Sequence, residues 1–102
     1  MIRKAFVMTL RPGHEAEYEQ RHNPIWPELH ATLTEHGVHN YSIFRHGLTL
    51  FAYAEIEDED RWAALAETAI VQKWWAHMEP LMECRPDRSP VSTDIDEVFH
   101  ID

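Results

Sequence analysis

The chain has 102 residues, 44% of them hydrophobic, which fits a single globular domain spanning residues 1–102. Eighteen acidic residues against nine basic ones give a formal net charge of −9, which disfavours nucleic acid and anionic membranes as partners and leaves neutral small molecules unaffected. No apolar run is long enough for a membrane span or a signal peptide, and the only cysteine, Cys84, cannot form an internal disulfide, so we expect a protein of the reducing cytoplasm.

The first third of the chain predicts a strand followed by a broken helix. Residues 2–10 place apolar side chains on one face at period two, which is typical of a strand. A helix is expected from about His14, and the pair Asn23-Pro24 interrupts it. Because asparagine is a good N-cap and proline is favoured at the first helical position, a second helical segment is expected to begin there at once. Gly37 is expected to end that segment.

The remaining two-thirds predicts a hairpin, a second broken helix and a last strand. Residues 38–46 and 48–57 are rich in β-branched and aromatic residues and flank a glycine, which predicts a hairpin. Asp58 is a candidate N-cap for the next helix, and Thr68 is a candidate cap for its restart. Residues 93–101, "TDIDEVFHI", alternate again and predict the final strand.

This β-α-β-β-α-β order predicts an α+β fold of the ferredoxin-like type, with a four-stranded antiparallel sheet and helices on one face. The strands carry more apolar side chains than one covered face needs, namely Ile43, Phe51, Tyr53 and Phe99. Because a large exposed apolar patch is unusual on a monomer, we expect a homodimer that closes sheet against sheet.

The stretch "EYEQRHNPIWPEL" places a histidine where the first helix is expected to end. Tyr18 lies one helical turn before His22, so both side chains share a face of the helix. One interpretation is an amphipathic helix whose tyrosine and histidine merely cover the sheet. The other is a site, because histidine titrates near neutral pH and transfers protons, and tyrosine donates hydrogen bonds. The pattern alone leaves both open.

Two adjacent tryptophans form the second unusual feature. Trp74 continues the helical spacing of the core positions Val71 and Met78, whereas Trp75 points about 100° away and is a candidate to face a cavity. Indole rings can pack on the apolar faces of sugars, and their N–H groups can bond hydroxyls. Tandem tryptophans also occur as simple core packing. Tyr41 lies in the middle of a predicted strand and could face either side of the sheet.

The other chemistry-bearing residues form no recognisable motif. The chain has eight histidines but no H-E-x-x-H pattern, and "HGVH" straddles a helix stop, so a metal site stays only as an alternative. Five histidines are expected on exposed faces: His14, His30, His46, His77 and His100. No glycine-rich phosphate loop and no G-x-S-x-G motif is present. If the protein is an enzyme, the residues favour cofactor-free acid–base or oxygen chemistry.

Several of these stretches together resemble a known family. The segments "RHNPIWPEL", "HNYSI", "RW" followed by "KWW", and "PVS" ahead of "EVF" are similar in order and position to those of the L-rhamnose mutarotases, over essentially the whole chain. The resemblance implies a cytoplasmic dimeric α+β barrel without metal or cofactor that interconverts the α and β anomers of L-rhamnose. It also implies His22 as the proton-donating residue, and as sugar contacts Tyr18, Tyr41, Trp74 and Trp75.

Mutarotation needs a proton delivered to the ring oxygen and another removed from the anomeric hydroxyl, which gives the open aldehyde. We expect His22 to protonate the ring oxygen, while no residue pattern identifies the acceptor of the second proton, the tryptophan that stacks on the sugar, or the selectivity among deoxy sugars. The alternatives are a cofactor-free monooxygenase or haem-degrading protein of the same barrel fold, because fold does not fix function. A non-enzymatic sugar-binding or metal-binding module is the third possibility.

Overall fold

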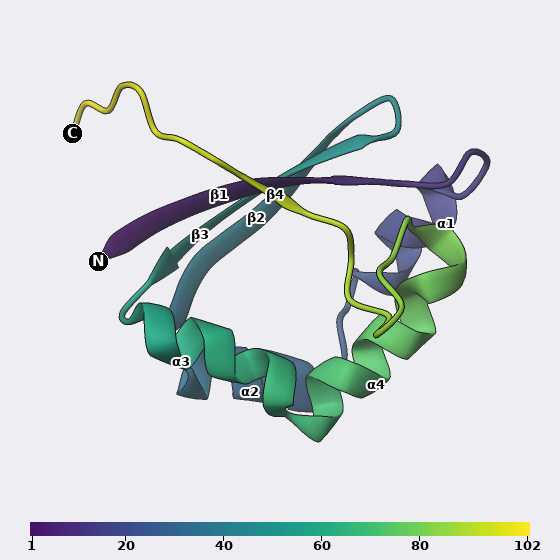
Figure 1. Cartoon of the computed structure of the whole chain (residues 1–102), viewed down its shortest axis with the longest axis horizontal. Coiled ribbons are helices and arrows are strands. Elements are labelled where there is room, and N and C mark those ends of the chain that lie inside the picture. The colour runs from purple at the N-terminus through teal and green to yellow at the C-terminus, as the bar shows by residue number, and fades with distance from the viewer.

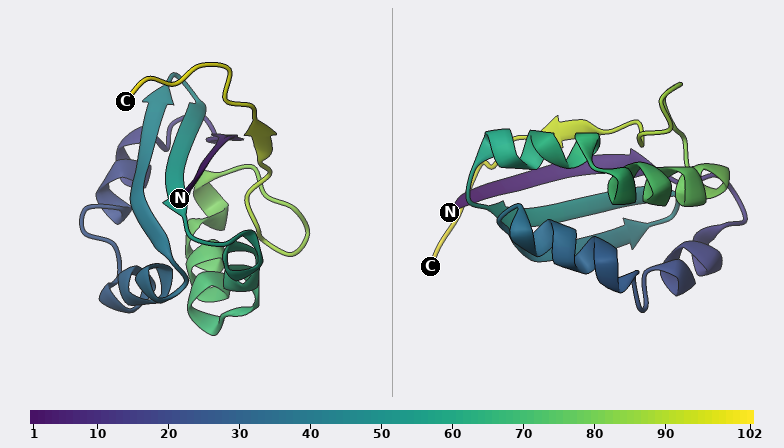
Figure 2. Two further views of the ribbon diagram at one scale, coloured as in Figure 1. Left: turned by 90° about the vertical axis from the view of Figure 1, so that its left-hand side faces the viewer. Right: turned by 90° about the horizontal axis from the view of Figure 1, so that it is seen from below.

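The computed structural model describes all residues 1–102 and shows one sheet with helices on a single face (Figures 1 and 2). The elements in chain order are β1 (Ile2–Thr9), α1 (Glu15–Arg21), α2 (Pro27–Glu35), β2 (Val38–His46), β3 (Thr49–Ile56), α3 (Glu59–Ala64), η1 (Leu65–Glu67), α4 (Ala69–Met78), η2 (Glu79–Leu81) and β4 (Thr93–Ile95). The antiparallel strands have the order β2-β3-β1-β4, which confirms the predicted ferredoxin-like arrangement. None of the helices has the length and apolarity that a bilayer span requires.

The ends of the helices follow the predicted caps. The side chain of Asp58 accepts a hydrogen bond from the backbone N–H of Asp60, and Thr68 does the same for Val71 at the start of α4. After α2, Gly37 has φ +80°, a left-handed conformation that favours glycine. A Cβ atom at this position would also lie only 3.0 Å from the Cβ atom of Glu57. The glycine therefore both ends the helix and allows the chain to approach β3 closely.

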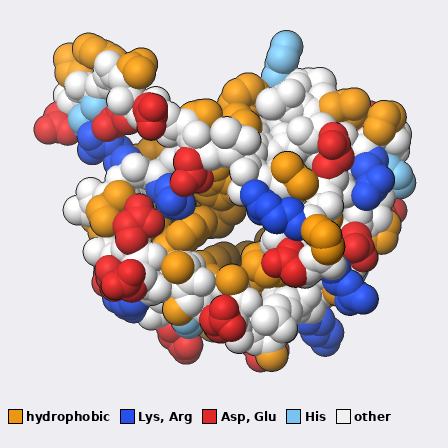
Figure 3. Space-filling view, in the orientation of Figure 1, with side chains coloured by type: hydrophobic (Ala, Val, Ile, Leu, Met, Phe, Trp, Pro, Cys, Tyr) orange, Lys and Arg blue, Asp and Glu red, His pale blue; other side chains and the backbone are white.

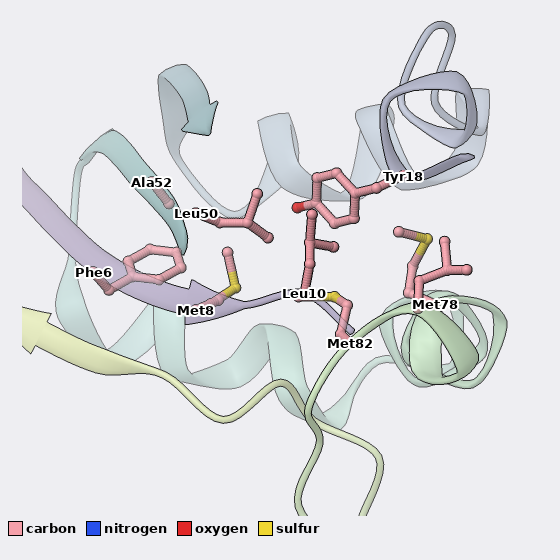
Figure 4. Close-up of a cluster of buried hydrophobic side chains, with 9 residues drawn as sticks. Phe6, Met8, Leu10, Tyr18, Leu50, Ala52, Met78 and Met82 are labelled. Atoms are coloured by element: carbon pink, nitrogen blue, oxygen red, sulfur yellow. The ribbon is translucent and has the colours of Figure 1, made fainter. Parts of the chain in front are cut away.

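The inner face of the sheet and the helices form two separate hydrophobic clusters. One cluster joins β1, β3, α1 and α4, as Figure 4 shows, and consists of Phe6, Met8, Leu10, Tyr18, Leu50, Ala52, Met78, Leu81 and Met82. The other joins β2, β3, α2, η1 and α4 and consists of Leu29, Val38, Ala54, Ile56, Leu65 and Val71. Trp62 and Trp74 pack against both clusters. The two clusters leave a space between them, bridged by these aromatic rings.

The second helical segment begins later than predicted. α2 starts at Pro27 with Trp26 as its N-cap residue, and no side chain caps it. Asn23 does not act as an N-cap, because its side chain donates instead to the backbone carbonyl of Glu19 in α1. Pro27 occupies the first helical position, where its missing N–H costs nothing. The prediction that helix resumes at Asn23-Pro24 was therefore wrong by one turn.

The last strand is shorter than predicted. β4 covers only Thr93–Ile95, paired with Ala5–Val7 of β1, and residues 96–102 form no strand within this chain. Beyond the end of β4, Glu97 still lies beside β1, where it forms an ion pair of 2.7 Å with Arg3. In this register Ile2, the first residue of β1, lies opposite Val98, so residues 99–102 have no partner strand. These residues project from the body of the domain (Figure 1).

The outer face of the sheet, which no helix covers, carries an apolar group of side chains. Cross-strand pairs place Phe44 beside Phe51, and Val7 beside Phe51. With Ala5, Tyr53 and Ile95 they form what we call the outer patch: Ala5, Val7, Phe44, Phe51, Tyr53 and Ile95. Phe44 is 65% exposed. Ile43, by contrast, faces inward and packs on the first cluster.

Candidate active site

A cavity of about 1080 Å³ opens between the sheet and the helices. Figure 3 shows this hollow with largely hydrophobic walls, and it lies between the two core clusters. Its size is at the upper end of the roughly 300–1,000 Å³ range of ligand cavities. The residues predicted for a site all line it: Tyr18, His22, Tyr41, Trp74 and Trp75. Residues from α1, β2 and α4, far apart in sequence, therefore meet at one space.

His22 is held at the end of α1 in a fixed orientation. It is the C-cap residue of the helix, as predicted, and its Nδ1 atom lies 2.9 Å from the backbone carbonyl oxygen of Tyr18. Its ring packs against the ring of Tyr18, with 4.3 Å between centroids, and meets the edge of Trp74 at 5.2 Å. No group in the chain bonds the Nε2 atom of His22. That nitrogen is therefore available to a ligand in the cavity.

The surroundings of His22 favour its neutral form. Burial lowers its pKa below the ordinary histidine value, although the bond to the Tyr18 carbonyl acts in the opposite direction. No neighbouring charge contributes to this shift in pKa. At neutral pH the imidazole is therefore uncharged, which suits a group that exchanges protons with a neutral ligand.

Two tyrosine hydroxyls face the same space. Tyr18 is 7% exposed and points from α1 toward Leu50 of the sheet (Figure 4). Tyr41 approaches from β2 and is more accessible because it borders the cavity. Burial raises the pKa of Tyr41 to about 12, and burial together with the nearby Tyr41 raises the pKa of Tyr18 further. Both hydroxyls stay protonated, and neither makes a hydrogen bond within the chain, so each can donate to a ligand.

The tryptophans form the aromatic wall of the cavity. Trp74 and Trp75 are both half-buried and both line the space, so the expected division into one core ring and one cavity ring is less sharp than predicted. Trp74 meets the ring of Trp26 at 5.0 Å between centroids in addition to its contact with His22. These packed rings offer flat apolar surface with N–H groups at their edges.

Trp62 is a cavity residue that the sequence pattern did not identify. It lies 6.1 Å from the ring of Tyr41 and 5.9 Å from that of Phe6, measured between centroids, and it lines the cavity. Its helical spacing in α3 predicted a core position, which it partly occupies. The dipeptide "RW" within the family-like segments was the only signal for a further role.

The remaining histidines take no part in a metal site. No group of three or more histidine, cysteine, aspartate or glutamate side chains is arranged to hold a metal ion. His77 was expected on an exposed face, but it is half-buried and packs against Trp26 and Trp74 at 5.0 and 5.6 Å between ring centroids. It follows one turn after Lys73 and Trp74, on the side of α4 that faces α2. The exposure predicted for His77 was therefore wrong.

The charged residues of the site lie mostly at its border. Glu19, Arg45, Arg85 and Asp87 line the cavity but are solvent-exposed residues. The interior instead offers two neutral hydroxyl donors, one imidazole nitrogen and aromatic walls. Such an interior fits a small neutral ligand that is rich in hydroxyl groups and has apolar faces.

Known proteins resemble this chain over its whole length. The family model described as L-rhamnose mutarotase matches residues 3–101. The L-rhamnose mutarotases of Opitutus terrae and Oceanobacillus iheyensis are 62% and 58% identical to the chain, with 100% of each chain covered. The crystal structure of the L-rhamnose mutarotase from Formosa agariphila matches with a TM-score of 0.92 at 40% identity, covering 100% of both chains.

The fold and the cavity define a small α+β protein whose site suits a neutral, hydroxyl-rich ligand. The comparisons specify the substrate. The chain belongs to the L-rhamnose mutarotase family, and it is an isomerase that interconverts the α and β anomers of L-rhamnose. The relatives named above give no support to the alternatives of a monooxygenase, a haem-degrading protein or a non-enzymatic binding module.

Proposed function

We propose that L-rhamnose binds in the cavity between sheet and helices and that His22 protonates its ring oxygen during ring opening. The observation that carries this proposal is the convergence of three unpartnered polar groups on one cavity: the His22 Nε2 atom and the hydroxyls of Tyr18 and Tyr41. Ring opening breaks the bond between C1 and the ring oxygen, adds a proton to that oxygen and removes the proton of the anomeric hydroxyl, which gives the open aldehyde. Rotation about C1–C2 and reclosure then produce the other anomer. The chemistry needs no metal or cofactor.

The other cavity residues bind and orient the sugar. Tyr18 and Tyr41 donate hydrogen bonds to its oxygen atoms, which is supported by the raised pKa of each hydroxyl. Trp74 and Trp75 pack against its apolar surface. Because the uncatalysed reaction already proceeds in water, positioned proton transfer of about 10²- to 10⁴-fold supplies a useful acceleration. Orientation of the sugar against fixed groups adds to it.

Replacing Tyr18 or Tyr41 by phenylalanine should lower kcat/KM for anomer exchange by about three- to tenfold each, since a hydrogen bond contributes about 0.5–1.5 kcal/mol. The rate is measured by NMR saturation transfer between the α and β signals of L-rhamnose. Tyr53→Phe is the matched control, because the Tyr53 hydroxyl lies outside the cavity and bonds Glu55 at 2.9 Å. Equal activity of Tyr18→Phe, Tyr41→Phe and Tyr53→Phe would contradict the assignment.

We further propose that the protein acts as a homodimer joined through the outer patch. The patch leaves Phe44, Phe51 and Ile95 at least 40% exposed, an arrangement that monomers seldom tolerate. The projecting segment after β4 adds Val98, Phe99 and Ile101, which are 94%, 77% and 77% exposed. A second copy placed against the sheet would cover both groups at once. The family's place in sugar metabolism and the single free cysteine support a cytoplasmic location.

Phe44→Glu should convert the dimer into monomers, because it would bury a charge in place of the most exposed ring of the outer patch. Sedimentation equilibrium measures the mass directly, with the wild-type protein expected at twice the mass of one chain. Ala31→Glu, on an exposed position of α2, should leave the dimer intact. A monomeric wild-type protein, or a Phe44→Glu variant that dimerises as tightly, would contradict the proposed interface.

A further inference from the structure

We propose that the Nε2 atom of His22 carries out both proton transfers of ring opening: it first takes the proton of the anomeric hydroxyl and then delivers that proton to the ring oxygen. This inference rests on the proposed function. Besides a donor to the ring oxygen, mutarotation requires a group that accepts the proton of the anomeric hydroxyl, and the inference assigns that group. The acceptor of the first proton and the donor to the ring oxygen are the same atom, Nε2 of His22.

The hydrogen bond at Nδ1 fixes which nitrogen carries the proton. The Tyr18 carbonyl oxygen, 2.9 Å from Nδ1, can only accept a hydrogen bond, so Nδ1 must carry the hydrogen atom. In the neutral ring the other nitrogen then has a free lone pair. Nε2 has no hydrogen-bond partner within the chain, and the His22 residue lines the cavity. The neutral enzyme therefore meets the sugar with a base, and it has no proton to donate until it has accepted one.

A single nitrogen can serve both oxygens because the anomeric oxygen and the ring oxygen are bonded to the same carbon atom, C1. Nε2 takes the proton from the anomeric hydroxyl as the C1–O bond there becomes a carbonyl. The bond from C1 to the ring oxygen breaks, and its electron pair goes to that oxygen. The imidazolium N–H then gives the proton to the ring oxygen, which leaves a neutral aldehyde and neutral His22. Reclosure after rotation follows the same steps in reverse.

The tyrosines complete this scheme without changing their charge. Their raised pKa values keep both hydroxyls protonated, so they donate hydrogen bonds and do not act as bases. Donors of this kind stabilise negative charge that develops on the ring oxygen before Nε2 returns its proton. The imidazolium is short-lived, and burial of the ring favours its return to the neutral form.

Neighbouring elements carry other titratable groups, but none of them adds a charge effect to the pKa of His22. The titratable or charged residues of these elements that line the cavity with His22 are Glu15, Tyr18 and Glu19 on α1, His30 on α2, Tyr41 and Arg45 on β2, and Arg85 and Asp87 on the loop after η2. Glu17, Arg21, Lys73 and His77 lie on α1 and α4 outside the cavity lining. Arg21 forms an ion pair of 2.8 Å with Glu17, and this carboxylate offsets the positive charge of Arg21 near the His22 ring.

The pH dependence of kcat/KM separates this scheme from one in which His22 begins as an imidazolium acid. The active form here is neutral, so kcat/KM, corrected for the uncatalysed rate, should be constant above neutrality. It should fall about tenfold per pH unit once the pH is below the pKa of His22, which lies under the ordinary value of about 6.5. A rate that instead falls as the pH rises through this region would overturn the proposal.

Nitrogen-15 NMR of the imidazole rings tests the protonation directly. His36 ends α2 in the same way, with its Nδ1 atom 2.8 Å from the Thr32 carbonyl oxygen, and it lies outside the cavity. At pH 8 the His22 ring should show a protonated Nδ1 and a free Nε2, and added L-rhamnose should shift the Nε2 signal of His22 and not that of His36. A protonated Nε2 at His22 would overturn this inference alone. Full activity of His22→Ala would overturn the proposed function as well, so the two failures are distinguishable.

Discussion

Replacement of His22 by alanine should lower kcat/KM for L-rhamnose anomer exchange by about 10²- to 10⁴-fold, the range that positioned acid–base groups contribute. The variant loses the imidazole to which we assign the proton transfers, which is held in the cavity by its Nδ1 atom 2.9 Å from the Tyr18 carbonyl oxygen. Saturation transfer between the α and β signals measures the rate at equal concentrations of folded protein.

The matched control is His36→Ala. His36 has the same position at a helix end and the same bond to the carbonyl four residues before it, 2.8 Å to Thr32, but no access to the cavity. Its replacement should leave kcat/KM unchanged and should reproduce any loss of stability that comes from removing a helix-end histidine. If both variants keep wild-type exchange rates, His22 does not transfer the proton.

Replacement of Trp74 by alanine should have the largest effect on stability, lowering the free energy of unfolding by about 3 kcal/mol. Trp74 is half-buried, but it packs against both hydrophobic clusters and against the rings of Trp26, His22 and His77. Its removal would enlarge the cavity that lies between the two clusters. Urea denaturation followed by circular dichroism measures the change.

Two further variants separate packing from ligand contact at this position. Trp74→Phe keeps an aromatic ring and should recover more than half of the lost stability. Trp75→Ala should cost less than Trp74→Ala, because Trp75 packs against only the second cluster. A Trp74→Ala variant as stable as the wild-type protein would show that the ring does not bridge the clusters.

Local patterns predicted most of the fold. Period-two alternation predicted β1, and strand-type residues on both sides of Gly47 predicted the hairpin. Asp58 and Thr68 cap the starts of α3 and α4 as predicted, and Gly37 follows the end of α2. The end of β4 was not predictable from alternation, because pairing stops at Ala5 and Ile95 although the sequence keeps alternating and β1 extends to Ile2. Asn23 bonds back to the Glu19 carbonyl of α1 and does not cap α2, so the choice between two local bonds open to an asparagine decided this boundary.

The part of the site that lies on a single helix was predicted from the sequence. Tyr18 and His22 are four residues apart, so their shared face follows from helix geometry. The side of Tyr41 does not follow from strand alternation. A β-bulge lies between His39 and Ser42, and Asn40 has a φ of +48° there. The extra residue shifts the alternation, so that Tyr41 borders the cavity and Ser42 pairs with Tyr53 on the outer face.

The most direct test of the central claim, that L-rhamnose binds between the sheet and the helices, is a titration of the His22→Ala variant followed by the indole N–H signals. The chain has four tryptophans, of which Trp62, Trp74 and Trp75 line the cavity and Trp26 does not. We predict that added L-rhamnose shifts the three cavity signals more than that of Trp26. Saturable binding that leaves all three unchanged would contradict the site.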